Sequence, residues 1–154
     1  MTLLHQMRQE NVLKLINVYY DSGILHLVLP RVELDLEKVI EKYKQEENKV
    51  IKTFPMDENM IKSLSWQLLT GIYYLHSRNL IHRDLKPSNI GISKVNTGWK
   101  LCIIDFGSVR CTCTHRCNSS DLEMSTVNVM TPKYRAPELY YRRTYSSAGW
   151  SSFK

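Results

Sequence analysis

Long apolar runs are absent from this sequence: none approaches the roughly 18 residues that a membrane-spanning helix needs. The first residues also lack the charged start and apolar core of a secretory signal. Glycine and proline are scarce, with 6 and 5 in 154 residues, and we find no internal repeat. Together these features predict one ordinary globular domain with no membrane partner.

Cysteine is also rare and unevenly placed. Three of the 4 cysteines fall within seven residues, which is not how a disulfide framework spreads over a secreted domain. We therefore expect a reducing compartment, cytoplasmic and/or nuclear. A zinc site remains an alternative to a loop with incidental cysteines, although its spacing is tighter than that of most structural zinc sites. Its ligands would be Cys111, Cys113, His115 and Cys117.

The formal net charge of +6 comes from Lys and Arg that are scattered rather than gathered in one run. Nucleic-acid binding would need a clustered stripe or a known module, so no nucleic-acid partner is expected. A positive site for a small phosphate-bearing ligand fits the charge equally well.

Two apolar runs near the N-terminus, Leu13 to Tyr20 and Ile24 to Leu29, predict a pair of strands. The turn signal Asp21-Ser22-Gly23 separates them, and Pro30 ends the second because it cannot donate to a sheet. Upstream, Leu3, Leu4 and Met7 suit the last turns of a helix.

Two helices and another strand pair follow. The first helix has apolar positions at Leu36, Val39, Ile40 and Tyr43, and residues 44–55 then predict a polar loop. Asp57 can cap a second, longer helix. Its predicted apolar face comprises Ile61, Leu64, Leu68, Ile72 and Leu75. Short strands are expected at 90–93 and 101–104, joined by a turn at 96–98.

Three motifs carry chemical meaning. Residues 82–89 read His-Arg-Asp-Leu-Lys-Pro-Ser-Asn, Asp105-Phe106-Gly107 follows, and Ala136-Pro137-Glu138 lies beyond. In this order they resemble the signatures of a eukaryotic protein kinase domain. The resemblance runs from about Leu3 to Tyr145 and covers the middle of that domain.

The resemblance implies ATP-dependent phosphoryl transfer to a protein substrate. Asp84 would be the catalytic base that orients the acceptor hydroxyl, and Lys86 would neutralise charge on the transferred phosphate. A Lys at that position resembles serine/threonine-specific kinases. Asn89 and Asp105 would hold Mg²⁺ through hard oxygen ligands.

The same resemblance places the ATP pocket. Leu29 falls at the gatekeeper position, and Pro30, Arg31 and Val32 fall in the hinge that contacts adenine. Gly91 would form the pocket floor, where the family usually has a larger apolar residue, so we expect a thin adenine contact. His82 and Phe106 are expected in the apolar spine of the domain.

Regulation is also implied. The strings at 10–13, 87–89 and 134–138 resemble the group of mitogen-activated and cyclin-dependent kinases. If Thr131 belongs to the substrate-binding loop, the doubly phosphorylated Thr-x-Tyr positions correspond to Thr126 and Asn128. A single phosphate on Thr126 is then expected, with Arg83 and Arg110 as its donors and an upstream kinase as partner; the alternative is an unmodified loop residue.

The expected fold is α+β, a partial kinase-like fold with a remnant of the N-lobe sheet and the first half of the helical C-lobe. No G-x-G-x-x-G or V-A-I-K string is present, and Trp150 replaces an expected aspartate, so both ends resemble cuts. We expect residues 1–29 to be the N-lobe remnant, 30–32 the hinge, 33–148 the partial C-lobe and 149–154 a divergent tail.

Glu138 would normally pair with an Arg from a later helix. Because that partner and the covering helices are missing here, we expect the chain to fold poorly alone and to expose a large apolar patch. The alternative function is a catalytically inactive fragment that acts as a binding or competitor protein.

Overall fold

The computed structural model describes residues 6–45, 57–112 and 131–136, which belong to two compact units. The first unit contains Met1–Tyr74 and Pro87–Asp105, and the second contains Leu75–Lys86 and Phe106–Lys154. Several expectations lie outside the described residues. These are the helix at Leu3 and Leu4, the phosphosite Thr126, the ion pair of Glu138, and three of the four proposed zinc ligands, Cys113, His115 and Cys117.

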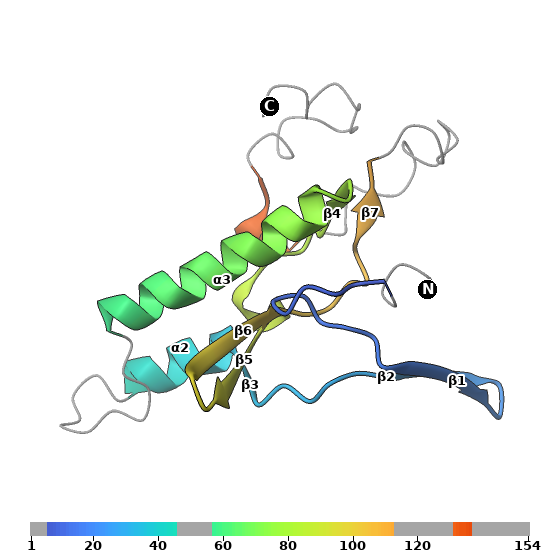
Figure 1. The fold of residues 1–154 in the computed structure, drawn as a ribbon, viewed down its shortest axis with the longest axis horizontal. Helices are drawn as coiled ribbons and strands as arrows, with labels where there is room; N and C mark the ends of the chain where they lie inside the picture. The colour runs from blue at the N-terminus through green and yellow to red at the C-terminus, as the bar shows by residue number, and fades with distance from the viewer. Residues whose placement is uncertain (1–5, 46–56, 113–130, 137–154) are drawn as a thin grey trace. The chain divides into compact units, whose positions relative to one another are not determined.

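The predicted strand pair is an antiparallel hairpin of β1 (Asn17–Asp21) and β2 (Ile24–Val28), drawn in blue in Figure 1. Ser22 and Gly23 connect the strands with φ angles of 48° and 83°. Two consecutive positive φ values are typical of the tight turn that suits the twist of a hairpin. The turn prediction is confirmed, and β2 ends before Pro30 as expected.

The predicted start of the first strand at Leu13 is wrong. The backbone N–H of Leu13 instead donates to the carbonyl of Ile103 at 2.9 Å, and Val12 bridges the same residue in parallel. Leu13 and Leu15 are buried, whereas most of the hairpin is exposed. This apolar run therefore divides between the core and the hairpin.

A three-stranded sheet forms the centre of the first unit, in the order β3 (Leu34–Asp35), β5 (Ile90–Val95), β6 (Gly98–Ile103). Both strand pairs are antiparallel. The predicted pair at 90–93 and 101–104 is confirmed, with strands that reach closer to the turn. Leu101 and Ile103 alternate with half-buried neighbours on β6, as expected for a strand with one face in the core.

Helices α2 (Leu36–Gln45) and α3 (Glu58–His76) supply the other side of this core (Figure 1). Both were predicted, although α2 includes Lys44, which the sequence had placed in the following loop. An aspartate precedes each helix: Asp35 accepts the Lys38 N–H at 2.8 Å, and Asp57 accepts the Met60 N–H at 2.7 Å. The buried cluster contains Val39, Met60, Leu64, Ile90, Ile92 and Leu101.

Replacing Asp57 with Ala is expected to weaken the first turn of α3. The change removes an acceptor for an N–H that has no partner within the helix, at a cost of about 1 kcal/mol. Amide hydrogen exchange at Met60 should therefore become about fivefold faster. Asp57→Asn is the matched control because it keeps the acceptor. Unchanged exchange in Asp57→Ala would contradict the capping role.

The predicted apolar face of α3 is correct except at its start. Leu64 and Leu75 are buried and Leu68 packs on the core, but Ile61 is exposed. A separate stripe of Trp66, Leu69 and Tyr73 is 73%, 61% and 74% exposed. The helix thus exposes apolar side chains, although not on the face that was expected to be uncovered. In the described part of the chain, no helix is long and apolar enough to cross a membrane.

The second unit contains two very short strands, β4 (Leu80–Ile81) and β7 (Arg110–Cys111), which pair antiparallel. Asn79 turns the chain into β4 with a φ of 57°, and its carbonyl accepts the Thr112 N–H at 2.8 Å. Neither strand was predicted, because two residues carry no readable periodicity. Cys111 is disulfide-bonded here, and a disulfide sulfur is not the thiolate that the zinc alternative requires.

Candidate active site

The side chains of Lys86 and Thr131 meet the carboxylate of Asp84 in the second unit. Lys86 Nζ lies 2.8 Å from one Asp84 carboxylate oxygen. The Thr131 hydroxyl donates to the other oxygen at 2.9 Å, and the Thr131 backbone N–H donates to it at 3.2 Å. Lys86 Nζ also donates to the Thr131 hydroxyl oxygen at 2.9 Å. The carboxylate and the ammonium therefore hold one hydroxyl between them.

The environment keeps Asp84 ionised. Burial of the carboxyl raises its pKa, but hydrogen bonds from Lys86 and Thr131, with the charge of Lys86, outweigh burial and lower the pKa below its ordinary value. A carboxyl whose pKa is lowered by folding stabilises the folded state at pH values above its pKa in the unfolded chain, which is about 3.9. This stabilisation is lost as the pH falls through the lower pKa of the folded state. Asp84 is thus a carboxylate at neutral pH.

Lys86→Met is expected to raise the pKa of Asp84, because it removes a hydrogen bond and a positive charge while burial remains. The carboxyl should then take up its proton at a higher pH in a ¹³C NMR titration. Lys38→Met is the matched control, since Lys38 pairs with Asp35 at 2.6 Å and does not contact Asp84. An Asp84 titration that is the same in Lys86→Met and wild type would contradict the assignment.

His82 and Arg83, the two residues before Asp84, also make their contacts within the second unit. His82 is buried, and its ring lies edge-on to the Phe106 ring with 5.4 Å between the ring centroids. This packing agrees with the expected structural role. Arg83 has a φ of 67°, and its Nε donates to the Ser108 carbonyl at 2.6 Å. A left-handed backbone at a residue other than glycine costs energy and is concentrated at functional sites.

Asn89 and Asp105, the predicted magnesium ligands, lie in the first unit at neighbouring positions. The Ile104 N–H, directly before Asp105, donates to the Asn89 carbonyl at 3.0 Å. Asn89 ends a 3₁₀ turn (Pro87–Asn89) and is buried, whereas Asp105 is exposed with a φ of 61°. An amide oxygen and a carboxylate are the hard donors that Mg²⁺ prefers, so this pair fits the ion.

The predicted adenine floor at Gly91 is closely covered by the hinge. A Cβ on Gly91 would lie 2.5 and 3.1 Å from the two γ-carbons of Val32 and 3.3 Å from Ile104 Cγ2. Val32 therefore takes up the space that a larger floor residue would fill. The remaining predicted hinge residues, Pro30 and Arg31, are exposed, as is Leu29.

Arg110 lies on β7 opposite Ile81, two residues before Arg83. The short β4–β7 pair therefore places Arg110 opposite the segment that leads into Arg83. The contacts of Thr131 with Asp84 and Lys86 were not indicated by the sequence. Thr131 was assigned to the substrate loop, but 47 residues separate it from Asp84, and no local pattern reveals such a contact.

Comparisons with known proteins identify the family of this chain. The family model for the protein kinase domain matches residues 1–151. Cyclin-dependent kinase 1 of Encephalitozoon cuniculi is 33% identical, with 97% of this chain and 47% of that protein covered. Mitogen-activated protein kinase 13 of Bos taurus is 36% identical, covering 89% of this chain and 32% of that protein. Cyclin-dependent kinase E-1 of Arabidopsis thaliana is 37% identical, covering 95% of this chain and 30% of that protein.

The chain therefore spans between 30% and 47% of the length of these three relatives. The family match covers nearly all of this sequence, and the relatives belong to the group that the motifs indicated. From its motifs, its α+β fold and these matches, the chain belongs to the protein kinase domain family, with serine/threonine kinases of the cyclin-dependent and mitogen-activated type as relatives.

Proposed function

We propose that this chain transfers the γ-phosphoryl group of ATP to a serine or threonine hydroxyl of a protein, as part of intracellular signalling in the cytoplasm or nucleus. One observation carries the proposal: Asp84 and Lys86 already hold a threonine hydroxyl between them. An acceptor hydroxyl needs the same two partners, one for its proton and one for its oxygen. The site is therefore chemically suited to an alcohol acceptor.

In the proposed reaction, the acceptor oxygen bonds to the γ-phosphorus while the bond from that phosphorus to the ADP oxygen breaks. The Asp84 carboxylate accepts the hydroxyl proton and orients the oxygen. Lys86 offsets the negative charge of the transferred group. Because its pKa is lowered, Asp84 is ionised before the acceptor arrives and can accept a hydrogen bond from the acceptor hydroxyl at neutral pH.

Protein kinase domains generally use ATP and Mg²⁺. In this chain Asn89 and Asp105 would hold the ion, which supplies charge neutralisation at the phosphates when bound. Leu29, Pro30, Arg31, Val32 and Gly91 would line the adenine side. The lack of a large side chain at Gly91 is offset by Val32, which packs over it.

Regulation by phosphate on Thr126 is part of the proposal. Arginine pairs suit phosphate because their N–H groups match its oxygens. The support for this phosphosite is that Arg110 lies opposite Ile81, and Ile81 is two residues before Arg83 in the sequence. An upstream kinase would supply the phosphate, and phosphopeptide mapping in cells tests the site.

The transfer itself is tested with γ-³²P-labelled ATP, Mg²⁺ and a general acceptor such as casein. We expect label on serine or threonine that disappears when EDTA removes the metal. Asp105→Asn should lower transfer and raise the Mg²⁺ concentration that is needed. Labelling that is insensitive to both EDTA and Asp105→Asn would contradict the proposal.

A second candidate function is a non-catalytic binding protein that competes with an intact relative. The exposed stripe of Trp66, Leu69 and Tyr73 favours it, because exposed apolar patches often mark interaction sites. Absence of any transfer, together with capture of a related kinase that a Trp66→Ser, Leu69→Ser variant loses, would favour this alternative over catalysis.

A further inference from the structure

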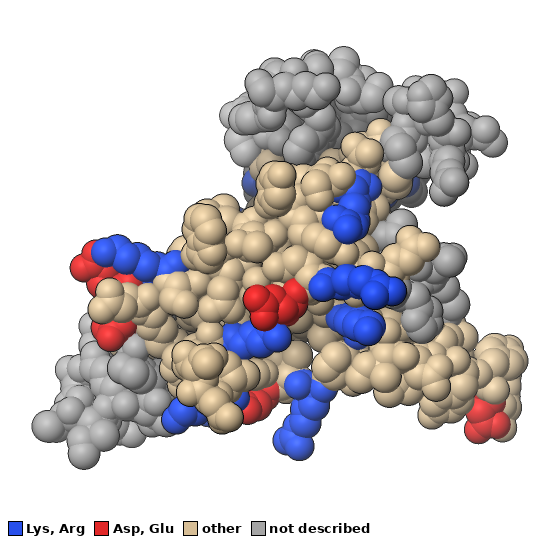
Figure 2. Space-filling view, viewed as in Figure 1, with Lys and Arg blue, Asp and Glu red and all other residues tan. Residues whose placement is uncertain are grey.

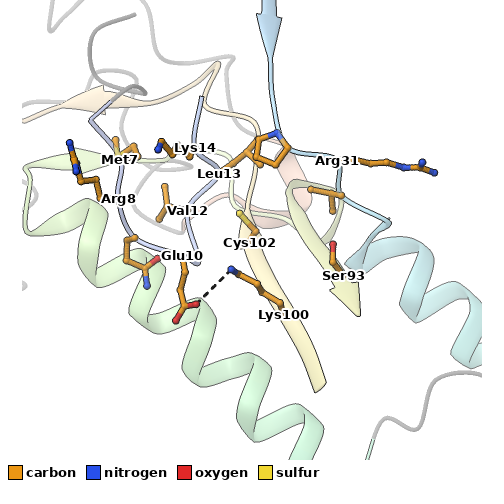
Figure 3. A pocket seen from close by; sticks show the side chains of 13 residues that line it. Met7, Arg8, Glu10, Val12, Leu13, Lys14, Arg31, Ser93, Lys100 and Cys102 are labelled. Carbon is orange, nitrogen blue, oxygen red and sulfur yellow. Dashed lines mark ion pairs between the residues drawn. The ribbon is translucent and has the colours of Figure 1, made fainter. Parts of the chain in front are cut away.

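A hollow of about 610 Å³ lies in the first unit. Three segments line it: residues 7–14, hinge residues 30–32, and Ser93, Lys100 and Cys102 on β5 and β6. Figure 3 shows Arg8 and Arg31 on opposite sides of this lining. Its volume is within the range of sites that hold small molecules or short peptide segments.

The floor of the hollow is apolar. Met7, Val12 and Leu13 contribute to the lining, and each is at least nine-tenths buried as a residue. Cys102 is half-buried beside them, and burial raises the pKa of its thiol to about 11, so it is a neutral thiol. An aliphatic side chain of a ligand would lose water against this floor without leaving a polar group unpaired.

The rim is basic. Arg8, Lys14 and Arg31 are exposed there, and Lys100 is half-exposed. Among the described residues that line the pocket, Glu10 is the only acidic one. Glu10 pairs with Lys100 at 3.6 Å. Within residues 6–45, 57–112 and 131–136, the other three cations form no ion pair. Figure 2 shows basic side chains on either side of an acidic group near the middle of this view, with further groups of both signs around them.

We propose that this basic pocket binds an acidic peptide segment of a partner protein, with an aliphatic side chain seated on the floor and Asp or Glu side chains facing Arg8 and Lys14. Charge complementarity selects the occupant: the rim carries three cations that no acidic side chain of the described chain neutralises. Oppositely charged surfaces also speed the encounter of two proteins.

A single-stranded nucleic acid fits this lining less well. Proteins that bind single strands stack bases on aromatic side chains, and none of the described residues that line the pocket is aromatic. The inference does not depend on phosphoryl transfer, because it uses none of the four residues assigned to base, phosphate and metal roles (Asp84, Lys86, Asn89 and Asp105). The lining does share the hinge residues Pro30, Arg31 and Val32 with the proposed nucleotide site.

The test measures fluorescence anisotropy of a labelled probe peptide, Glu-Asp-Glu-Leu-Asp-Glu, added to the 154-residue chain. Arg8→Glu combined with Lys14→Glu should weaken binding about tenfold, because two attractions become repulsions. Lys42→Glu combined with Lys44→Glu is the matched control, with the same change in net charge on exposed residues of α2 outside the pocket. Arg31 is left unchanged because of its predicted hinge role.

Two further arms separate this inference from general charge attraction. A probe with Ser in place of Leu should bind at least threefold more weakly, and the bound Leu probe should slow alkylation of Cys102, which mass spectrometry follows. The proposal would be overturned if both double variants lost binding equally, or if the Leu and Ser probes bound equally well. It would also be overturned if a dT oligonucleotide bound as well as the Leu probe, or if the Leu probe did not bind at all.

Discussion

Asp84→Asn is expected to reduce phosphate transfer by about 10²–10⁴-fold, the usual contribution of a positioned general base. The amide keeps nearly the same shape but cannot take the proton of the acceptor hydroxyl. It also removes the negative charge that faces Lys86 at 2.8 Å. Initial rates of casein labelling at saturating Mg²⁺ and ATP measure the effect.

Asp21→Asn serves as the control for this prediction, because Asp21 is an exposed carboxylate of the hairpin. Its rate should equal that of the wild type. ATP affinity should also be little changed in Asp84→Asn, since the base is not among the predicted nucleotide contacts. A rate in Asp84→Asn within a factor of two of the Asp21→Asn rate would contradict the catalytic role.

Gly91→Ala is expected to destabilise the first unit by about 1–3 kcal/mol, the usual cost of overpacking. The new methyl group would meet both γ-carbons of Val32, at 2.5 and 3.1 Å. Valine is stiff about its first side-chain torsion, so it cannot simply rotate away. Ile104 lies 3.3 Å from the same point and directly precedes Asp105, so ATP affinity should fall as well.

The combined variant Gly91→Ala, Val32→Ala tests the cause of this effect. Removing both γ-carbons of Val32 opens the space that the new methyl needs, so the cost of Gly91→Ala should shrink in the Val32→Ala background. A coupling energy of about 0.5–3 kcal/mol from urea unfolding is expected for two residues in contact. Additive effects of the two changes would show that the predicted clash is absent.

Local signals in the sequence predicted much of the fold. The Asp21-Ser22-Gly23 string identified the hairpin turn, because Ser22 and Gly23 adopt the positive φ angles that such a turn needs. Asp57 marked the start of α3 through its side chain, which can accept a free N–H. The residues of the candidate site were found by motif, since Asp84, Asn89 and Asp105 occur in fixed strings.

Contacts between distant residues were not predictable in this way. Leu13 was placed in the hairpin because it extends an apolar run, whereas its backbone pairs with Ile103, 90 residues later. The Thr131–Asp84 contact and the packing of Val32 over Gly91 depend on how segments meet in space. No periodicity or spacing along the chain predicts such long-range contacts.

The central claim of the proposal is that Asp84 and Lys86 act on the hydroxyl of an alcohol that accepts a phosphoryl group from ATP. Its most direct test uses ATP labelled with ¹⁸O on the γ-phosphate, followed by mass spectrometry of the acceptor protein after incubation with wild type or Asp84→Asn. The account predicts phosphoserine or phosphothreonine carrying three ¹⁸O atoms with the wild type and almost none with the variant. Equal amounts of labelled product with both proteins, or none with the wild type, would contradict it.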